Sequence, residues 1–334
     1  MRILKMAFQT KTVIADVNDA RVLYKALCGV FTIYKPTYMC FEKMKYTLIS
    51  NLCRDLNNKN VRPPVKYVSI DGPTNSHMRV QTRYSYSDNT LVVGPRYQKQ
   101  DFILGASRIV LAESSGVVVC GINEGTSFIK SMRYSNFTKF YKVKGLLGQA
   151  TDTYFHTGKI KERSTYNHVK RGHIDRICNS MQSSHQRKMF EHCGVDIQSQ
   201  AAYDLAVKGL LRPADRKIPM IYTIRCIDFS PPEFTLEIVC INEDEMYLKT
   251  IVHDVGIRLH STATCTQINC LQDGLFNADI ALLKKHWTLY DILSNMQMCH
   301  RIIQKNKSVL YKGSPTLMEY DTDNVAKSQK ELEP

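Results

Sequence analysis

The residues best suited to chemistry fall in one segment, 139–153, which has the alternation of a strand over Tyr141–Leu147. Tyr141 offers an aromatic face, and every nucleic-acid base presents a π-face that can stack on it. We expect Lys139, Lys142 and Lys144 to share one face of this strand, where they would contact phosphates. Without a family context, a tyrosine packed in a core is the preferred interpretation of Tyr141, and the segment alone does not establish contact with nucleic acid.

Basic residues are abundant elsewhere. The chain has 45 Lys and Arg against 31 Asp and Glu, a net charge of +14 and a pI of about 9.2. Such an excess attracts polyanions, so the candidate partners are RNA, DNA and anionic lipid. Two groups of basic residues follow the segment: Lys159, Lys161, Arg163, Lys170 and Arg171, then Arg187, Lys188, Lys208 and Arg212. For any single lysine, a solvated face is the better interpretation.

The sequence offers little support for a metal site or for thiol chemistry. His185, His192 and Cys193 come nearest to a cluster, but their spacing matches no zinc pattern. The eleven cysteines include no C-x-x-C pair, which predicts free thiols in a reducing compartment. The spacing therefore predicts neither a zinc site nor a redox motif.

Periodicity predicts the elements that must position these residues. A buried strand is expected at 116–122, because this run is continuously apolar. Residues 57–90 read as a loop-rich insertion with one short strand at 67–70. Other strands are expected at 29–34, 141–147, 220–229 and 234–240, and helices at 40–56, 123–134, 168–181, 199–211, 246–258, 278–285 and 288–305. Strands and helices do not alternate strictly, so an α+β fold is favoured.

The two ends differ from the rest. Residues 1–25 read as an extension, and its Arg2, Lys5 and Lys11, with no acid before Asp16, fit a short mitochondrial presequence weakly. The polar tail 313–334 is expected to be disordered. No apolar run reaches the length of a membrane span.

The segment from Lys139 to Thr153, followed by Gly158, resembles the K-x-Y-x-x-x-x-x-L-G-x-x-T-D-T pattern of the TruB family of pseudouridine synthases. Gly29–Pro36 resembles the family's first motif. Ser184-His185-Gln186 with Tyr203–Gly209 resembles its RNA-gripping insertion, and Tyr247-Leu248-Lys249 its Y-[IL]-R motif. Asp273–Phe276 resembles the closing G-x-F segment. Residues 28–290 are most similar to the branch of animal mitochondria.

The resemblance implies a pseudouridine synthase domain over 26–312, with a mixed, largely antiparallel sheet flanked by helices. It implies a gripping insertion at about 184–213 and no C-terminal PUA domain. It also implies a reaction that requires no metal and no organic cofactor. It further implies a catalytic role for Tyr141. Substrate-binding roles are implied for Lys35, Tyr141, Gln186, Lys208 and Tyr247.

The family's nucleophile is an aspartate in H-R-L-D-x-x-A-S-G, and counting back from Ser115-Gly116 puts Leu111 at its position. Leucine has no nucleophilic or acid–base capability. Lys249 stands where the family has an arginine, and with Leu111 opposite we expect no carboxylate for it to pair with. A gap would be needed to bring Glu113 or Asp101 into register.

Three hypotheses follow from the resemblance. The first is an RNA-binding or RNA-assembly protein on a synthase fold whose catalysis is impaired at Leu111. The second is an active synthase of tRNA or mitochondrial RNA that uses an unorthodox carboxylate such as Glu113. The third is a partner protein whose old RNA groove binds protein. The expected partners are tRNA, mitochondrial messenger or ribosomal RNA and RNA-processing proteins, and the expected protein is a monomer of the mitochondrial matrix, with cytoplasm or nucleus as the alternatives.

Overall fold

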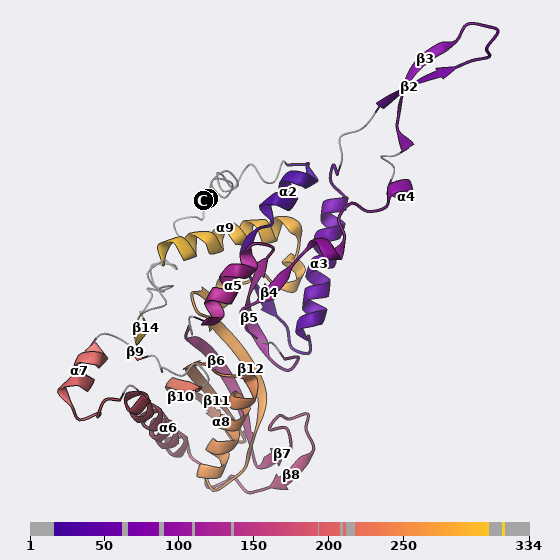
Figure 1. Cartoon of the computed structure of the whole chain (residues 1–334). Coiled ribbons are helices and arrows are strands. Elements are labelled where there is room, and N and C mark those ends of the chain that lie inside the picture. Colours follow the sequence, from indigo (N-terminus) through magenta and orange to yellow (C-terminus); the bar gives the residue numbers. More distant parts are fainter. Residues whose placement is uncertain are drawn as a thin grey trace, which may run out of the picture.

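A mixed sheet of eight strands runs through the molecule (Figure 1). The computed structural model describes residues 17–61, 66–86, 90–108, 111–134, 137–192, 194–207, 210–211, 218–306 and 316–317. The strands lie in the order β1 (Gly29–Lys35), β5 (Ser115–Ile122), β12 (Ala263–Asp273), β6 (Lys139–Leu147), β11 (Glu233–Ile241) and β10 (Met220–Ser230). Short strands β4 (Leu104–Ala106) and β13 (Phe276–Asn277) flank β5 and β12.

All neighbours in this sheet are antiparallel except β12 and β5, which run parallel. Their pairing consists of Asn269 opposite Ser115 and Cys270 opposite Gly116. The predicted α+β class and the mixed, largely antiparallel sheet are therefore confirmed. Strand β5 is buried along its whole length, as its continuous apolar run predicted.

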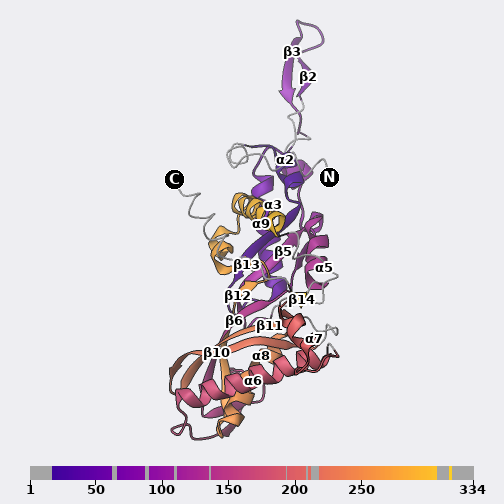
Figure 2. The same ribbon diagram turned by 90° about the vertical axis from the view of Figure 1, so that its left-hand side faces the viewer.

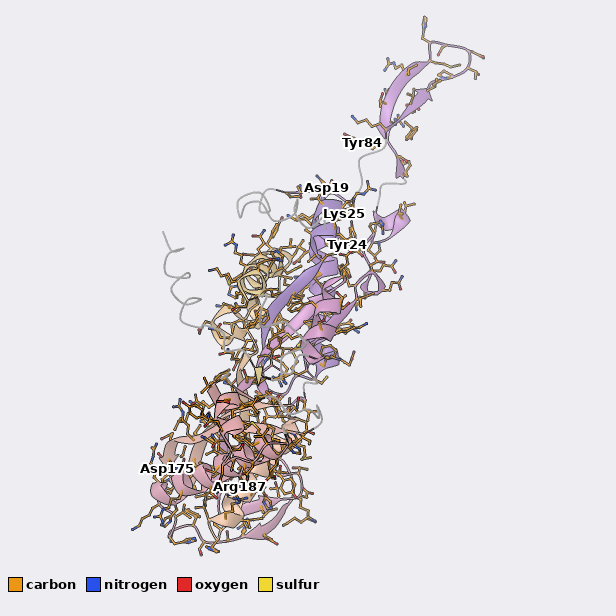
Figure 3. All side chains as sticks on the ribbon, turned by 60° about the vertical axis from the view of Figure 1, so that its left-hand side comes forward. Asp19, Tyr24, Lys25, Tyr84, Asp175 and Arg187 are labelled. Carbon is orange, nitrogen blue, oxygen red and sulfur yellow. The ribbon has the colours of Figure 1, made fainter. Side chains whose placement is uncertain are left out.

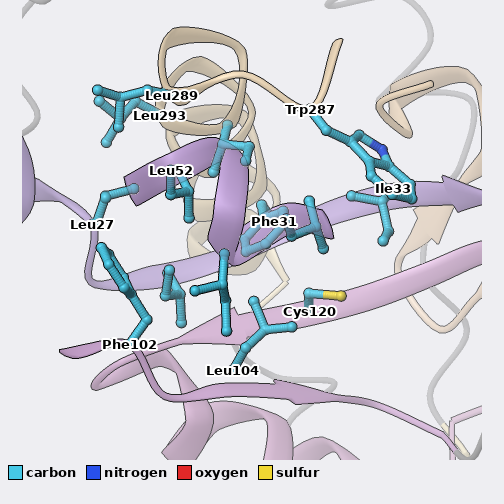
Figure 4. Close-up of a cluster of buried hydrophobic side chains, with 14 of the residues drawn as sticks. Leu27, Phe31, Ile33, Leu52, Phe102, Leu104, Cys120, Trp287, Leu289 and Leu293 are labelled. Carbon is cyan, nitrogen blue, oxygen red and sulfur yellow. The ribbon is translucent and has the colours of Figure 1, made fainter. Parts of the chain in front are cut away.

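The β1–β5 half of the sheet is covered by α2 (Ala20–Ala26), α3 (Phe41–Asn57) and α9 (Leu289–Lys305). Phe31 and Ile33 of β1 and Cys120 of β5 pack against Leu52 of α3 and Leu293 of α9 (Figure 4). Helix α5 (Gly125–Tyr134) packs with a second cluster on the strands, through Ile129 and Met132.

The other half of the sheet is covered by α6 (Arg171–His192) and α8 (Glu245–Arg258), as Figure 2 shows. Tyr141 and Val143 of β6 pack in this core with Cys178 of α6 and Leu248 of α8. Helix α7 (Gln200–Val207) follows α6.

Two small hairpins leave the sheet. Strands β2 (Lys66–Asp71) and β3 (Arg79–Tyr84) form the first, so the insertion predicted to hold one strand holds two. A short helix, α4 (Thr90–Val93), and the turn η2 (Lys99–Asp101) return from it to β4. Strands β7 (Gln149–Thr151) and β8 (Ile160–Arg163) form the second.

Other expectations need correction. The helix predicted at 278–285 is two single turns, η3 (Ala278–Ile280) and η4 (Lys284–His286), and β12 was not predicted. Helix α2 buries Leu23 in the core, so the predicted extension 1–25 overlaps the domain. In the predicted tail, β14 (Thr316–Leu317) pairs with β9 (Leu210–Leu211). Residues 1–16 and the rest of the tail lie outside the described residues.

Among the described residues, no helix is long and apolar enough to cross a membrane.

Candidate functional site

A pocket of about 640 Å³ lies where α5 ends and α8 begins. It brings together Leu111 and Tyr141, two of the predicted catalytic positions, which stand on separate elements. Charged side chains of both signs line it. The lining residues are Ser107, Arg108, Leu111, Met132, Arg133, Phe137, Lys139, Tyr141, Asn242, Glu243, Asp244, Glu245, Met246 and Asp273.

Tyr141 is 1 % exposed, and its hydroxyl donates to Glu243 Oε1 at 2.6 Å. Lys139 Nζ donates to the same oxygen at 2.8 Å. Burial raises the pKa of Tyr141 well above its ordinary value, so the hydroxyl stays protonated and remains a donor. Stacking a base on this ring would require the side chains that cover it to move.

The prediction that three lysines share one strand face is wrong. Successive side chains of a strand point to opposite faces, so Lys139 lies on the face of Tyr141, two residues away. Lys142 and Lys144 are offset by an odd number and lie on the other face. Both are half-buried there, opposite Asn269 and Gln267 of β12.

An arginine–carboxylate pair stands inside the pocket. Arg108 Nη1 lies 3.3 Å from Glu245 Oε1, and both side chains are buried. The same oxygen accepts from Ser114 Oγ at 2.6 Å and from the backbone N of Leu111 at 3.1 Å. The Arg108 guanidinium carbon is 5.9 Å from the Tyr141 ring centroid. Glu245 therefore joins the N-terminus of α8 to the loop that carries Leu111.

Sequence reasoning missed Glu243 and Glu245. The available signal was the acidic run Glu243–Glu245 directly before an apolar helical pattern, with Asp244 as the N-cap whose side chain accepts from Tyr247 N at 2.6 Å. An acidic run at a helix start is ordinarily a cap, so nothing in the pattern singled out a pocket.

Leu111 is 43 % exposed at the pocket. The next residue, Ala112, is fixed through its carbonyl, which accepts from Tyr38 N at 2.6 Å and from Lys35 Nζ at 3.4 Å. Lys35 is fully buried and also donates to Met39 O at 3.0 Å. Burial lowers the pKa of Lys35 to about 8. The ammonium group thus binds backbone carbonyls, and its contact with substrate stays a prediction.

Lys249 forms an ion pair with Glu113 and lies 5.0 Å from the Phe155 ring centroid. The expectation that Lys249 has no carboxylate partner is therefore wrong. Its partner is Glu113, which follows Leu111 by two residues in the sequence. Lys249 is buried, Glu113 is half-buried, and neither lines the pocket. Asp101, the other carboxylate considered, caps the turn η2 by accepting from Gln98 N at 2.8 Å.

The remaining predicted binding residues lie apart from the pocket. The hydroxyl of Tyr247 and His185 Nε2 are 3.2 Å apart, which joins α8 to α6. Burial lowers the pKa of His185 to about 4. Gln186 is exposed on the surface of α6, and Lys208 lies outside the described residues.

Comparison with known proteins gives a consistent picture. The family model described as "TruB family pseudouridylate synthase (N terminal domain)" matches residues 112–246. The chain is 38 % identical over 284 residues to the protein named "Pseudouridylate synthase TRUB2, mitochondrial" of Xenopus tropicalis, covering 83 % of this chain and 87 % of that protein. It is 35 % identical over 273 residues to the human protein of the same name, covering 80 % and 82 %.

Among solved structures, the "Crystal structure of the archaeal box H/ACA sRNP Nop10-Cbf5 complex" overlaps with a TM-score of 0.44 at 10 % identity. The overlap covers 85 % of this chain and 57 % of that chain.

Proposed function

Because this chain belongs to the TruB family of pseudouridine synthases, we propose that it binds RNA in mitochondria and isomerises uridine poorly or not at all. The location follows from the relatives, which are named as mitochondrial proteins. The RNA partner follows from the family reaction, which acts on uridine within RNA. The loss of catalysis follows from the residue at position 111.

The observation that carries this proposal is Leu111 at the pocket. The family reaction needs a carboxylate nucleophile beside the flipped base, and leucine supplies none. Each of the four acids that line the pocket has a hydrogen-bond partner: Glu243 binds Tyr141 and Lys139, Glu245 binds Arg108 and Ser114, Asp244 accepts from Tyr247 N, and Asp273 accepts from Ser107 Oγ. One oxygen each of Glu243 and Glu245 is buried without a hydrogen-bond partner among the described residues, but neither residue stands at position 111, where the family places its nucleophile.

RNA binding is supported by exposed basic residues away from the pocket. Lys159, Lys161 and Arg163 are exposed on and beside β8, and Arg187 and Lys188 are exposed on α6. Contacts between such side chains and phosphates release counterions, so affinity falls as salt rises, with a slope of about −0.7 per contact on single strands.

The test is to incubate the purified chain with transfer RNA and mitochondrial RNA transcripts and to quantify pseudouridine by nucleoside mass spectrometry. We expect no product above the background of a heat-inactivated control, together with RNA binding that weakens as salt rises. A Leu111→Asp variant shows whether the rest of the pocket still supports the reaction. Pseudouridine made by the unaltered chain in catalytic amounts would contradict the proposal.

One observation favours a second candidate function, an active synthase that uses Glu113. The Lys249–Glu113 ion pair supplies a cation and a carboxylate close to the loop of Leu111, which is the kind of pair the family reaction employs. This candidate predicts product from the unaltered chain that disappears in Glu113→Gln. The exposed Glu191→Gln variant serves as the matched control and should keep full activity.

A further inference from the structure

The β2–β3 hairpin stands away from the body of the molecule (Figures 1 and 2). Every described residue from 66 to 86 is exposed or half-buried, so the hairpin has no share in the cores that hold the sheet. An isolated two-stranded hairpin is marginally stable in water. Holding such an element away from the body is consistent with a role in contacting a partner.

Aromatic and cationic side chains alternate at the end of the hairpin nearest the body. Lys66 stands opposite Tyr84 and Tyr67 opposite Arg83 in the strand register. Lys66 Nζ lies 5.2 Å from the Tyr84 ring centroid. Tyr67, Tyr84 and Tyr86 are 42 %, 65 % and 75 % exposed.

The charge of the hairpin selects the kind of partner. Residues 66–86 contain three cations, Lys66, Arg79 and Arg83, and one acid, Asp71, which gives a net charge of +2 with His77 neutral. The hairpin and the whole chain are therefore both positive, which opposes self-association and favours a polyanion.

We propose that the β2–β3 hairpin is an RNA-docking arm that holds unpaired nucleotides. Lys66 and Tyr84 lie on one face of the hairpin, and Tyr67 and Arg83 lie on the other. One base stacks on Tyr84 with its phosphate at Lys66, and another stacks on Tyr67 with its phosphate at Arg83, which also pairs with Asp71. Tyr86, just beyond the end of β3, offers a further exposed ring. Exposed aromatic side chains interleaved with cations are the chemistry by which proteins bind single-stranded nucleic acid without sequence preference. The inference rests on the proposed function, because it requires that the chain binds RNA.

The aliphatic side chains farther along the hairpin have a structural role in this account. Ile70 lies directly opposite Val80, and such β-branched pairs stabilise a two-stranded ribbon. A protein partner bound to the hairpin would instead contact these aliphatic side chains. Substituting them therefore distinguishes a protein partner from RNA.

The position of the arm extends the RNA footprint. The hairpin projects beyond α2 and α3, whereas α6 and α7 lie at the opposite end of the molecule, as the labels of Tyr84 and Arg187 in Figure 3 show. The pocket lies between these ends, at α5 and α8. An RNA that reaches the arm and the pocket together therefore carries a single-stranded stretch beyond the part held at the pocket.

The test measures binding of the full chain to a fluorescein-labelled 20-nucleotide oligouridylate by anisotropy. Stacking contributes about 1–3 kcal/mol per base, so Tyr67→Ala/Tyr84→Ala/Tyr86→Ala, which removes three rings, should weaken binding by about a hundredfold or more. The matching triple Phe variant keeps the rings and should bind within about twofold of the unaltered chain. Ile70→Thr/Val80→Thr keeps the β-branched shape and serves as the control.

Three outcomes would overturn the inference, each in a distinguishable way. Equal RNA affinity of the Ala and Phe variants would show that the aromatic rings of the arm do not contribute to RNA binding. That result would leave the proposed function intact. Loss of a dimer or protein complex in Ile70→Thr/Val80→Thr, with RNA affinity unchanged in the tyrosine variants, would identify a protein-docking arm. Absence of salt-sensitive RNA binding by the unaltered chain would refute the proposed function itself.

A direct measurement covers the case in which the Ala variant unfolds the hairpin. A 4-thiouridine probe crosslinked to the unaltered chain should yield modified peptides from residues 66–86. Crosslinks confined to other peptides would contradict the arm.

Discussion

Replacing Glu245 by alanine should destabilise the protein far more than an ordinary surface substitution. The carboxylate is buried and binds Arg108, Ser114 Oγ and Leu111 N through one oxygen. Its removal leaves the Arg108 guanidinium buried without its counterion, and breaking one member of a buried pair costs about 3–5 kcal/mol. For a chain of 334 residues that loss lowers the melting temperature by roughly 4–7 °C.

The assay is thermal unfolding followed by fluorescence, with Arg108→Met/Glu245→Leu as the comparison. Removing both charges leaves neither member of this pair buried without the other, so the double variant should be within about 2 kcal/mol of the unaltered chain. Glu245→Gln should fall between the two, because its amide oxygen still accepts from Ser114 but carries no charge. A melting temperature for Glu245→Ala within about 1 °C of the unaltered value would refute the argument that this pair holds the loop of Leu111.

Two further perturbations test the fold around the site. Folding lowers the pKa of His185 from 6.5 to about 4, so the unfolded chain takes up a proton first as the pH falls. Stability should therefore drop between about pH 6.5 and pH 4, and chemical denaturation of His185→Gln, which lacks this titration, should show a flatter profile. Gly116→Ala should destabilise by about 2–5 kcal/mol, since its φ is +113° and a Cβ would lie 2.1 Å from Cys270 O. Gly172→Ala, with open space around it, should melt at or slightly above the unaltered temperature; a similar loss in both glycine variants would contradict the close approach.

Much of the fold follows from local patterns. The apolar run 116–122 and the helical spacing of Met44, Leu48 and Leu52 correspond to β5 and α3 within a residue or two. Strand β12 was not predicted, because its residues from Ala263 to Asp273 mix Thr, Gln and Asn with buried cysteines. Its place in the middle of the sheet depends on pairing with β6 and β5, which are distant in sequence. Local periodicity carries no information on such pairing.

The residues of the site also divide into those that local sequence motifs predict and those that they do not. Tyr141 and Leu111 could be found from motif spacing, and the structure brings them to one pocket. The residues that contact Tyr141 and the loop of Leu111 could not be predicted from the sequence. Glu243 and Glu245 reach the pocket because α8 begins beside β6, and Glu113 reaches Lys249 because the loop of Leu111 bends toward α8. These contacts join residues more than 100 positions apart.

The parallel junction between β12 and β5 has a mechanical consequence. Two residue pairs connect a half-sheet packed on α3 and α9 to a half-sheet packed on α6 and α8. The β5–β12 pairing is a narrow seam between these two half-sheets, here called the two units, and the loop of Leu111 enters β5 at that seam. A ligand that contacts Leu111 on one side and Tyr141 on the other spans both units. The binding energy of such a ligand would then oppose separation of the two units. Ligand bound in the pocket would therefore stabilise the sheet as a whole.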